Sequence, residues 1–168
     1  MRITCGGQTP KRSGKRSKGT NSILNLRTLE QRDVEAVLAI QSGCAEIAQW
    51  TMWDYSRVAG GEMSGWVAEE SGEVAGFVVA RLVVTDIEIL NLAVRPESRR
   101  RGIGAMLLQG AFDWGRSLPT EKAMLEVRAS NLAALKFYER FGFHASGRRR
   151  HYYTAPIEDA LLLTVSLA

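Results

Sequence analysis

Cysteine and histidine are both scarce in this sequence. Its 168 residues include two cysteines, Cys5 and Cys44, and two histidines, His144 and His151. The two cysteines form no spacing pattern, so we expect no disulfide scaffold. Together the four residues make no metal-ligand cluster, and we expect no metal site. A reducing, cytoplasmic setting is the expectation that follows.

Long apolar runs are absent as well. The longest, such as VAGFVVA at residues 74–80, fall far short of the roughly 20 residues that cross a bilayer as a helix. The basic beginning of the sequence has no apolar segment and therefore lacks the pattern of a secretory signal. We expect no membrane partner.

Acidic residues are missing from the first part of the chain, where none precedes Glu30. The basic residues before position 20 are Arg2, Lys11, Arg12, Lys15, Arg16 and Lys18. Without these six, 16 basic residues face 18 acidic ones, so the net charge of +4 belongs to this segment. We expect residues 1–22 to form a disordered basic tail before a single domain at residues 23–168. The tail could contact RNA through phosphate attraction, but a solubilising tail or a start codon placed too early is the favoured interpretation.

Apolar periodicity and glycine punctuation predict the elements of the domain. A strand at 23–28 precedes two helical stretches at 29–43 and 45–61, the first opened by a capping box from Thr28 to Gln31. Further strands are expected at 65–70, 74–84, 86–94, 123–127, 143–153 and 157–167, and further helices from about 101 and at 130–142. The order β-α-α-β-β-β-α-β-α-β-β predicts an α/β (α+β) domain with a mixed, mostly antiparallel sheet and helices on both faces.

The stretch Arg99-Arg100-Arg101-Gly102-Ile103-Gly104 lies where a strand should give way to a helix. The first N–H groups of a helix have no intrahelical acceptor, and the helix dipole favours an anion there. Glycines permit close backbone approach, and arginines add charge-assisted hydrogen bonds to phosphate. The pattern favours a pyrophosphate. A glycine-containing helix start with solvated arginines is an equal alternative from these six residues alone.

Two familiar phosphate motifs do not fit this stretch. A P-loop would need lysine and then serine or threonine after its last glycine, where the chain has Ala105 and Met106. A dinucleotide-binding fingerprint would need glycine or alanine at Leu107 and would normally follow the first strand. The nature of the phosphate ligand therefore stays open on these residues.

Downstream, three residues have both an ordinary and a functional interpretation. Glu126 is the only acid within the predicted strand at 123–127, and most such carboxylates simply face water. Tyr138 lies in an apolar helical stretch, where an aromatic is usually core, although a phenol can protonate a departing thiolate. Asn131 suits a helix cap. The run from Arg148 to Arg150 is interpreted as a solvated strand edge.

Two segments carry a resemblance to a known family. NLAVRPESRRRGIGAMLL, at residues 91–108, resembles the acetyl-CoA signature of the GNAT N-acetyltransferases. LEVRASNLAALKFYERFGF at residues 125–143, followed by RRRHYY and EDALLL, resembles ribosomal-protein alanine N-acetyltransferases of the RimI type. The match is close over about 86–163 and extends to 22–85 only in layout. The downstream motifs together are more specific than the loop, which a very large superfamily shares.

The resemblance implies a GNAT-like fold, acetyl-CoA as co-substrate and no metal. It implies direct attack of an amine on the thioester, with Glu126 as general base, acting through water, and Tyr138 as general acid. A strand N–H near Ala93 or Val94 would stabilise the oxyanion. The residues implied to hold acetyl-CoA are Leu92, Ala93, Val94, Arg99, Arg100, Arg101, Gly102, Ile103, Gly104, Ala105 and Asn131.

Three functions are compatible with these features. The first is acetylation of the N-terminal alanine of a small-subunit ribosomal protein, and the second is acetylation of a small-molecule amine or a lysine side chain. The third is a basic-tailed module that binds the ribosome or RNA without catalysis, which would not need Glu126, Tyr138 and the glycine loop together. The first is favoured. Many members carry Phe-Pro-Trp where this chain reads AEIAQWTMWDYSRV, with Trp50 or Trp53 as stand-ins, and this departure weakens the acceptor assignment more than the reaction type.

Overall fold

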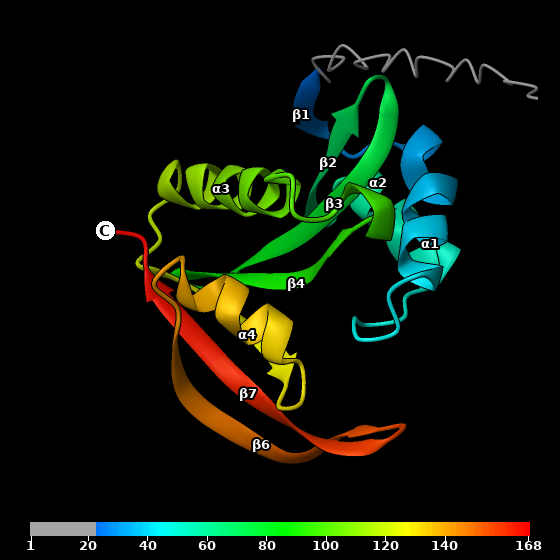
Figure 1. The fold of residues 1–168 in the computed structure, drawn as a ribbon. Coiled ribbons are helices and arrows are strands. Elements are labelled where there is room, and N and C mark those ends of the chain that lie inside the picture. The colour runs from blue at the N-terminus through cyan, green and yellow to red at the C-terminus, as the bar shows by residue number, and fades with distance from the viewer. Residues whose placement is uncertain (1–22) are drawn as a thin grey trace, which may run out of the picture.

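The computed structural model describes residues 23–168, so the expectations for the basic segment 1–22 lie outside the described residues. The helices and strands follow one another in the predicted order, with two 3-10 turns added (Figure 1). The strands are β1 Leu24–Thr28, β2 Ser64–Glu70, β3 Glu73–Val83, β4 Asp86–Val94, β5 Lys122–Arg128, β6 His144–Thr154 and β7 Ile157–Ser166. The helices are α1 Val34–Ser42, α2 Met52–Ala59, α3 Ile103–Arg116 and α4 Leu132–Glu139, and the 3-10 turns are η1 Gln31–Asp33 and η2 Pro96–Ser98. Within this part of the chain, no helix is long and apolar enough to cross a membrane.

The strands form one seven-stranded sheet in the order β1-β2-β3-β4-β5-β7-β6. Every neighbouring pair is antiparallel except β4 and β5, which are parallel. This confirms the predicted mixed, mostly antiparallel sheet. The parallel pairing joins only Asp86–Ile89 to Lys122–Leu125, although both strands continue beyond it. β4 and β5 therefore part in the middle of the sheet.

A bulge in β4 lies just where the two strands part. Val79 of β3 pairs with Asn91, and Ala80 pairs with Ile89, so Leu90 is the additional residue. An extra residue reverses the alternation of side chains between the two faces of a sheet. Before the bulge, Ile89 faces the same core as α3 and α4, whereas after it Leu92 does. The bulge thus decides which side chains of the second half of β4 face each core.

The two cores lie on opposite faces of the sheet. One contains the buried faces of α3 and α4, and the other contains those of α1 and α2. Figure 1 shows α1 and α2 together on one side, away from α3 and α4, which confirms the prediction of helices on both faces. Gly76 permits a close approach here, since a Cβ on it would lie 2.8 Å from the Ala93 carbonyl oxygen and 3.0 Å from the side chain of Leu107 in α3.

Two details of the first helices differ from the sequence prediction. The capping box forms between Glu30 and Asp33, not at Thr28, and it opens η1 before α1 begins. The stretch predicted as helix at 45–61 is helical only from Met52, because Thr51 and Asp54 form a second capping box. The Gln41 side chain holds the segment before it: its amide donates to the Trp50 carbonyl at 2.8 Å and accepts from the Trp50 N–H at 2.9 Å.

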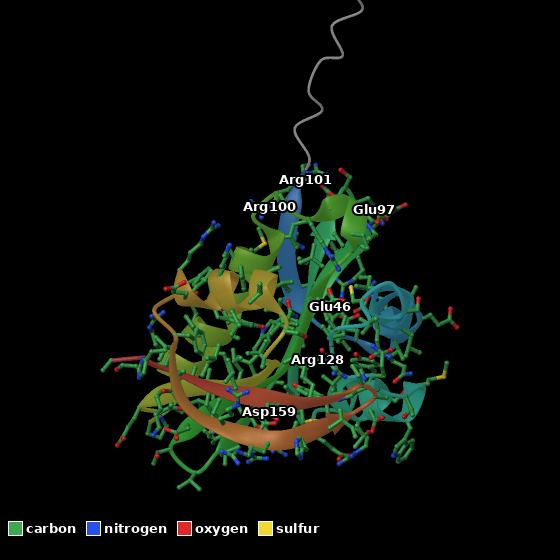
Figure 2. The ribbon with its side chains drawn as sticks, turned by 60° about the horizontal axis from the view of Figure 1, so that its bottom comes forward. Glu46, Glu97, Arg100, Arg101, Arg128 and Asp159 are labelled. Carbon is green, nitrogen blue, oxygen red and sulfur yellow. The ribbon has the colours of Figure 1, made fainter. Side chains whose placement is uncertain are left out.

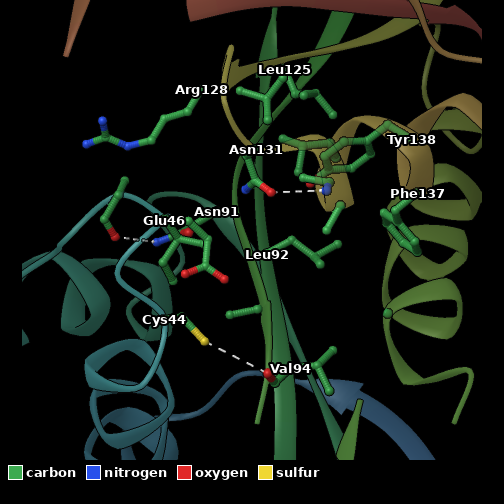
Figure 3. Close-up of a pocket in the computed structure, with 18 of the residues that line it drawn as sticks. Cys44, Glu46, Asn91, Leu92, Val94, Leu125, Arg128, Asn131, Phe137 and Tyr138 are labelled. Atoms are coloured by element: carbon green, nitrogen blue, oxygen red, sulfur yellow. Dashed lines mark hydrogen bonds between the residues drawn. The ribbon is translucent and has the colours of Figure 1, made fainter. Parts of the chain in front are cut away.

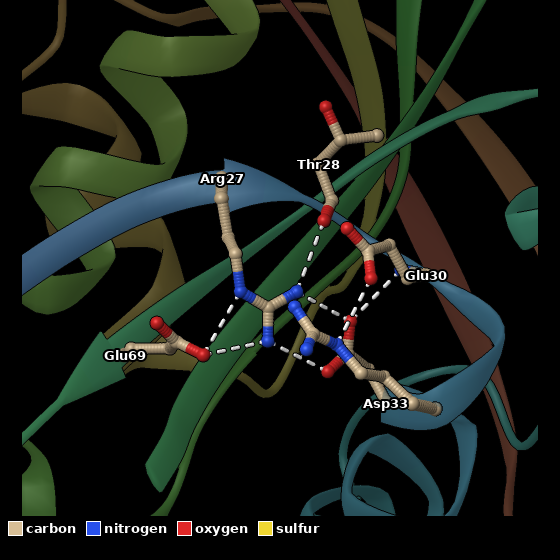
Figure 4. A network of polar contacts seen from close by, with 6 residues as sticks. Arg27, Thr28, Glu30, Asp33 and Glu69 are labelled. Carbon is tan, nitrogen blue, oxygen red and sulfur yellow. Dashed lines mark hydrogen bonds and ion pairs between the residues drawn. The ribbon is translucent and has the colours of Figure 1, made fainter. Parts of the chain in front are cut away.

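Arg27 joins β1 to its neighbours through a network of ion pairs (Figure 4). Its guanidinium contacts Asp33 at 2.7 Å and Glu69 at 2.6 Å. Burial acts to raise the pKa of Asp33, but hydrogen bonds from Arg27 and from the Glu30 N–H, with the Arg27 charge, lower it overall. Hydrogen bonds from Arg27 also lower the pKa of Glu69. Both carboxylates therefore stabilise the fold in their ionised form.

We expect Arg27→Met to lose less stability on acidification than the wild type does. With lowered folded-state pKa values, the stabilising contribution is complete above the unfolded pKa values of about 4 and is lost as the pH falls through the folded ones. Without Arg27, the folded-state pKa values of Asp33 and Glu69 rise, so acidification removes less stability from the variant. Urea unfolding between about pH 3 and 7 measures the difference. Arg57→Met, which breaks an exposed pair with Glu62, is the control and should follow the wild type, whereas equal acid slopes in wild type and Arg27→Met would contradict the expectation.

Candidate active site

A cavity of about 860 Å³ opens where β4 and β5 part. The segment between α1 and α2 lines one side, and the second half of β4 crosses its centre. The glycine stretch after β4, the end of β5, one face of α4 and two tyrosines of β6 complete it. Figure 3 shows β4 in the middle of this cavity, with Cys44 and Glu46 on one side and Phe137 and Tyr138 on the other. The cavity thus draws side chains from both faces of the sheet.

The glycine stretch adopts the conformation that an anion site requires. Arg100 and Gly102 both have left-handed backbone, with φ of 62° and 84°, and α3 begins directly after them at Ile103. The Met106 N–H donates to the Gly102 carbonyl at 3.0 Å. The N–H groups of the three residues before Met106 precede this first intrahelical bond, so they are available to a ligand. The predicted turn from strand to helix, with its glycines, is confirmed.

The three consecutive arginines have different surroundings. Arg99 turns toward the α1–α2 segment: its guanidinium donates to the Val94 carbonyl at 3.1 Å and lies 3.0 Å from the Cys44 sulfur. Arg101 forms an ion pair with the buried Glu70 and does not line the cavity. Arg100 lines the cavity and has no carboxylate partner within residues 23–168. Figure 2 shows Arg100 and Arg101 at the same end of the molecule. The predicted phosphate role of all three arginines stays a prediction.

The other residues predicted to hold the cofactor are grouped around the same cavity. Leu92, Ala93 and Val94 line it from β4, and Gly102 through Ala105 line it from the start of α3. Asn131 lines it from the start of α4, where its Oδ1 accepts the Ala134 N–H at 3.1 Å. Asn131 is therefore a helix cap, as one interpretation held, and it also borders the cavity.

Glu126 faces the cavity from β5 and is held by two residues of β6. Its carboxylate, 18% exposed, pairs with the Arg149 guanidinium at 3.0 Å. A hydrogen bond with Glu126 is the main cause that raises the pKa of Tyr152, with burial second. The Arg149 guanidinium also lies over the Tyr152 ring, 5.4 Å from its centre. Glu126 is thus not a freely solvated strand carboxylate.

A bulge in β6 brings Arg149 and Tyr152 to that position. Arg149 pairs with Ala160 and Tyr153 with Glu158, so three residues of β6 lie opposite Asp159 alone. Asp159 fills the bulge by accepting from the His151 N–H at 2.8 Å and from the Arg148 guanidinium at 2.6 Å. The interpretation of 148–150 as a solvated edge is therefore incomplete, because Arg148 and Arg149 are exposed but ion-paired.

The end of β5 is fixed by a second group of contacts. Arg128 pairs with Glu158 of β7 at 3.2 Å, and its guanidinium lies 4.0 Å from the centre of the Tyr153 ring. Glu158 in turn accepts the Ser130 N–H at 2.5 Å. In Figure 2, Arg128 and Asp159 lie on the β6–β7 side, away from Arg100. These contacts hold Glu126 in place without touching the glycine stretch.

Tyr138 is a buried residue of α4 that borders the cavity. Its ring packs edge-on against Phe137 and Phe143. Burial raises the pKa of its hydroxyl, so the group stays protonated at neutral pH. Within residues 23–168 that hydroxyl has no hydrogen-bond partner, and the side chain is 9% exposed. Tyr138 can therefore donate its proton to a group in the cavity.

Several residues at the cavity were not identified from the sequence. Lys136 and Arg140 line it from α4, and Asn91 lines it from the β4 bulge. The Asn91 amide donates to the Ala48 carbonyl at 3.0 Å and to the Tyr55 hydroxyl at 3.1 Å, and so ties β4 to the α1–α2 segment. An asparagine within an otherwise apolar buried half-strand was the available signal for Asn91. Lys136 and Arg140 carried no such signal in the sequence.

No group of three or more His, Cys, Asp or Glu side chains within 23–168 is arranged to hold a metal ion. The acids that line the cavity, Glu46, Glu88 and Glu126, each pair with an arginine.

Comparison with known proteins identifies the family. The model of the acetyltransferase (GNAT) family matches residues 26–143. The [ribosomal protein bS18]-alanine N-acetyltransferase of Escherichia coli (strain K12) is 30% identical over 145 residues, which cover 85% of this chain and 97% of that protein. The crystal structure of the ribosomal-protein-S18-alanine N-acetyltransferase from Escherichia coli matches with a TM-score of 0.78 and 29% identity, covering 87% of this chain and 95% of that one.

A further solved structure shares the fold at lower sequence identity. NAA60 of Arabidopsis thaliana in complex with acetyl-CoA has a TM-score of 0.80 and 22% identity, covering 86% of this chain and 98% of that one. A GNAT fold like this one thus holds acetyl-CoA in a solved complex. The chain belongs to the GNAT family of acetyltransferases, as its glycine stretch and downstream motifs predicted.

Proposed function

We propose that this acetyltransferase transfers the acetyl group of acetyl-CoA to the α-amine of an N-terminal alanine, in a ribosomal protein. One observation carries the proposal: Glu126 and Tyr138, from different elements, line the same cavity as the glycine stretch. The similarity to [ribosomal protein bS18]-alanine N-acetyltransferases over most of both chains supports the acceptor. A binding module without catalysis would not need this arrangement.

The cofactor would lie along β4 and the start of α3. Acetyl-CoA supplies a thioester, whose carbonyl carbon accepts a nucleophile and whose sulfur leaves as a thiolate. The N–H groups of Ile103, Gly104 and Ala105, with Arg100, suit its pyrophosphate. Leu92, Ala93 and Val94 would take the pantetheine arm, and Asn131 would contact the cofactor from the start of α4. Arg99 and Arg101 would act on the pyrophosphate only indirectly, because each forms an ion pair with a carboxylate from another segment.

The chemistry would be direct transfer. Glu126, through a water, would take one proton from the acceptor's ammonium group, because only the neutral amine has a lone pair. The amine nitrogen then bonds to the thioester carbon as the carbon–sulfur bond breaks, and the nitrogen releases its second proton to water as the amide forms. An N–H near Ala93 or Val94 would stabilise the negative charge on the thioester oxygen. Tyr138, which borders the cavity, would give its proton to the departing thiolate.

The alternative acceptor is a small-molecule amine or a lysine side chain. It would use the same cofactor site and differ only in the part of the cavity formed by the α1–α2 segment and β6. That part contains Trp50, Tyr152 and Tyr153 and lacks the proline of the family pattern. The acceptor is therefore the part of the proposal that most needs a direct test.

We expect this protein to acetylate a peptide that begins with alanine. Two peptides are each incubated with protein and acetyl-CoA and then weighed by mass spectrometry. One peptide has a free N-terminal alanine and no lysine, and the other has a blocked N-terminus and an internal lysine. A gain of one acetyl group on the first peptide alone, and its loss in Glu126→Gln, would support the proposal. Acetylation of the lysine peptide, or of neither, would overturn the N-terminal acceptor while leaving the family assignment in place.

A further inference from the structure

Most cations in the described part of the chain have an acidic partner. Of the sixteen Lys and Arg side chains between residues 23 and 168, twelve form an ion pair with a carboxylate. The four that do not are Arg100, Lys136, Arg140 and Arg150. Three of these four line the cavity, and only Arg150 does not. Among residues 23–168, the cations without a carboxylate partner are thus concentrated at the cavity.

The acids of the cavity do not balance this charge. Glu46 pairs with Arg99 at 3.5 Å, Glu88 with Arg81 at 2.6 Å and Glu126 with Arg149 at 3.0 Å. With every acid of the cavity already paired, Arg100, Lys136 and Arg140 remain as surplus positive charge. Surplus charge of one sign along a cavity attracts a ligand of the opposite sign. The cavity is therefore arranged for an anion with more than one charged group.

Lys136 and Arg140 lie beside the glycine stretch. They are four residues apart on or just after α4, so they share one face of the helix. Phe137, between them, packs on the start of α3, where a Cβ on Gly104 would lie 3.4 Å from its ring. The helix dipole favours a cation near the end of α4. The dipole alone does not explain why two like charges share one face of the helix, or why both border the cavity. An anionic ligand in the cavity explains both observations.

The chemistry of the proposed cofactor supplies two separate anions. Coenzyme A carries a pyrophosphate and, apart from it, a phosphate monoester on the 3′ oxygen of its ribose. The glycine stretch and Arg100 are already proposed for the pyrophosphate, and that proposal gives Lys136 and Arg140 no role. We propose that Lys136 and Arg140 form a binding site for the 3′-phosphate of coenzyme A. This inference rests on the proposed use of acetyl-CoA, and it adds a site that binds the 3′-phosphate of that cofactor.

Isothermal titration of the full-length protein with coenzyme A and with 3′-dephospho-coenzyme A tests the site. We expect the wild type to bind coenzyme A about tenfold or more tightly than the dephosphorylated form, because charge-assisted hydrogen bonds to phosphate are strong. In the double variant Lys136→Gln/Arg140→Gln, this preference should fall to about twofold or less, since only the affinity for coenzyme A decreases. Arg150→Gln removes the one arginine between residues 23 and 168 that has no carboxylate partner and lies outside the cavity, and it should keep the wild-type preference. Melting temperatures check that all variants fold.

The other outcomes overturn the inference in distinguishable ways. Equal binding of both ligands by the wild type would show that the 3′-phosphate is not recognised. Equal weakening of both ligands in the double variant would assign the α4 cations to the pyrophosphate or to the cavity's general charge. If the wild type bound neither ligand, the proposed use of acetyl-CoA would itself fail, and the 3′-phosphate site with it.

Discussion

Replacing Glu126 by Gln should lower kcat for peptide acetylation by about 10²–10⁴-fold, the range that a positioned general base contributes. Glutamine has nearly the same shape but cannot accept a proton, and an ammonium has no lone pair with which to attack. The pair with Arg149 is partly exposed, so its loss should cost little stability. The measurement is steady-state kinetics of acetyl transfer, with thermal unfolding to confirm the fold.

Glu139→Gln is the matched control for this prediction. Glu139 undergoes the same chemical change, is exposed on α4 and does not line the cavity. We expect its kcat to remain within about threefold of the wild type, in keeping with the small effects of surface changes. A Glu126→Gln variant that kept full kcat would show that the amine loses its proton elsewhere, most simply to bulk water, and would remove the assignment of Glu126 as base.

The order of elements could be predicted from the sequence because each boundary has a local cause. Apolar alternation defines β4, whose bounds of Asp86–Val94 match the predicted strand at 86–94. Gly43 caps the end of α1 as expected, whereas α4 already ends at Glu139 with Arg140 as its cap, and the predicted Gly142 follows in the next turn with a left-handed φ of 84°. These signals lie within a few residues of the boundary that they set. The sequence alone therefore sufficed for the order of the elements.

The prediction was wrong for 45–51 because the deciding contact there is not local. The apolar spacing of AEIAQW suits a helix. However, the Gln41 side chain forms hydrogen bonds with both the N–H and the carbonyl of Trp50, and these bonds replace the ones that a helix would make there. The parting of β4 and β5 was likewise invisible, since it depends on where a parallel pairing ends. The cavity follows from that parting, so its existence could not be derived from either strand alone.

The individual roles of the three arginines show the same limit within the site. Arg99, Arg100 and Arg101 are chemically identical and adjacent, and the sequence assigned all three to phosphate. Their differences come from acids far away in the chain, Glu46 for the first and Glu70 for the third. Arg99 and Arg100 both line the cavity, and position relative to distant partners, not residue type, leaves Arg100 without a carboxylate partner within residues 23–168. Lys136 and Arg140 were missed for the same reason.

Replacing Tyr138 by Phe should lower kcat by about 10²-fold, the lower end of the range for a general acid. The change removes only the hydroxyl, which has no partner within residues 23–168, so packing against Phe137 and Phe143 should persist. Because burial raises the pKa of this hydroxyl, wild-type Tyr138 is protonated at neutral pH. The variant differs from it only in lacking that proton donor. Steady-state kinetics with acetyl-CoA and the alanine peptide measure the effect.

Tyr55→Phe is an informative comparison, because burial raises the pKa of that tyrosine as well. Its hydroxyl donates to Gln41 at 2.6 Å and accepts from Asn91, so the same deletion there should lower the melting temperature more than it lowers kcat. Tyr138→Phe should do the opposite. If Tyr138→Phe kept its kcat, the thiolate must leave without that proton. A thiol pKa of about 8.5 makes such a departure feasible, and Tyr138 would then be a packing residue at the edge of the cavity.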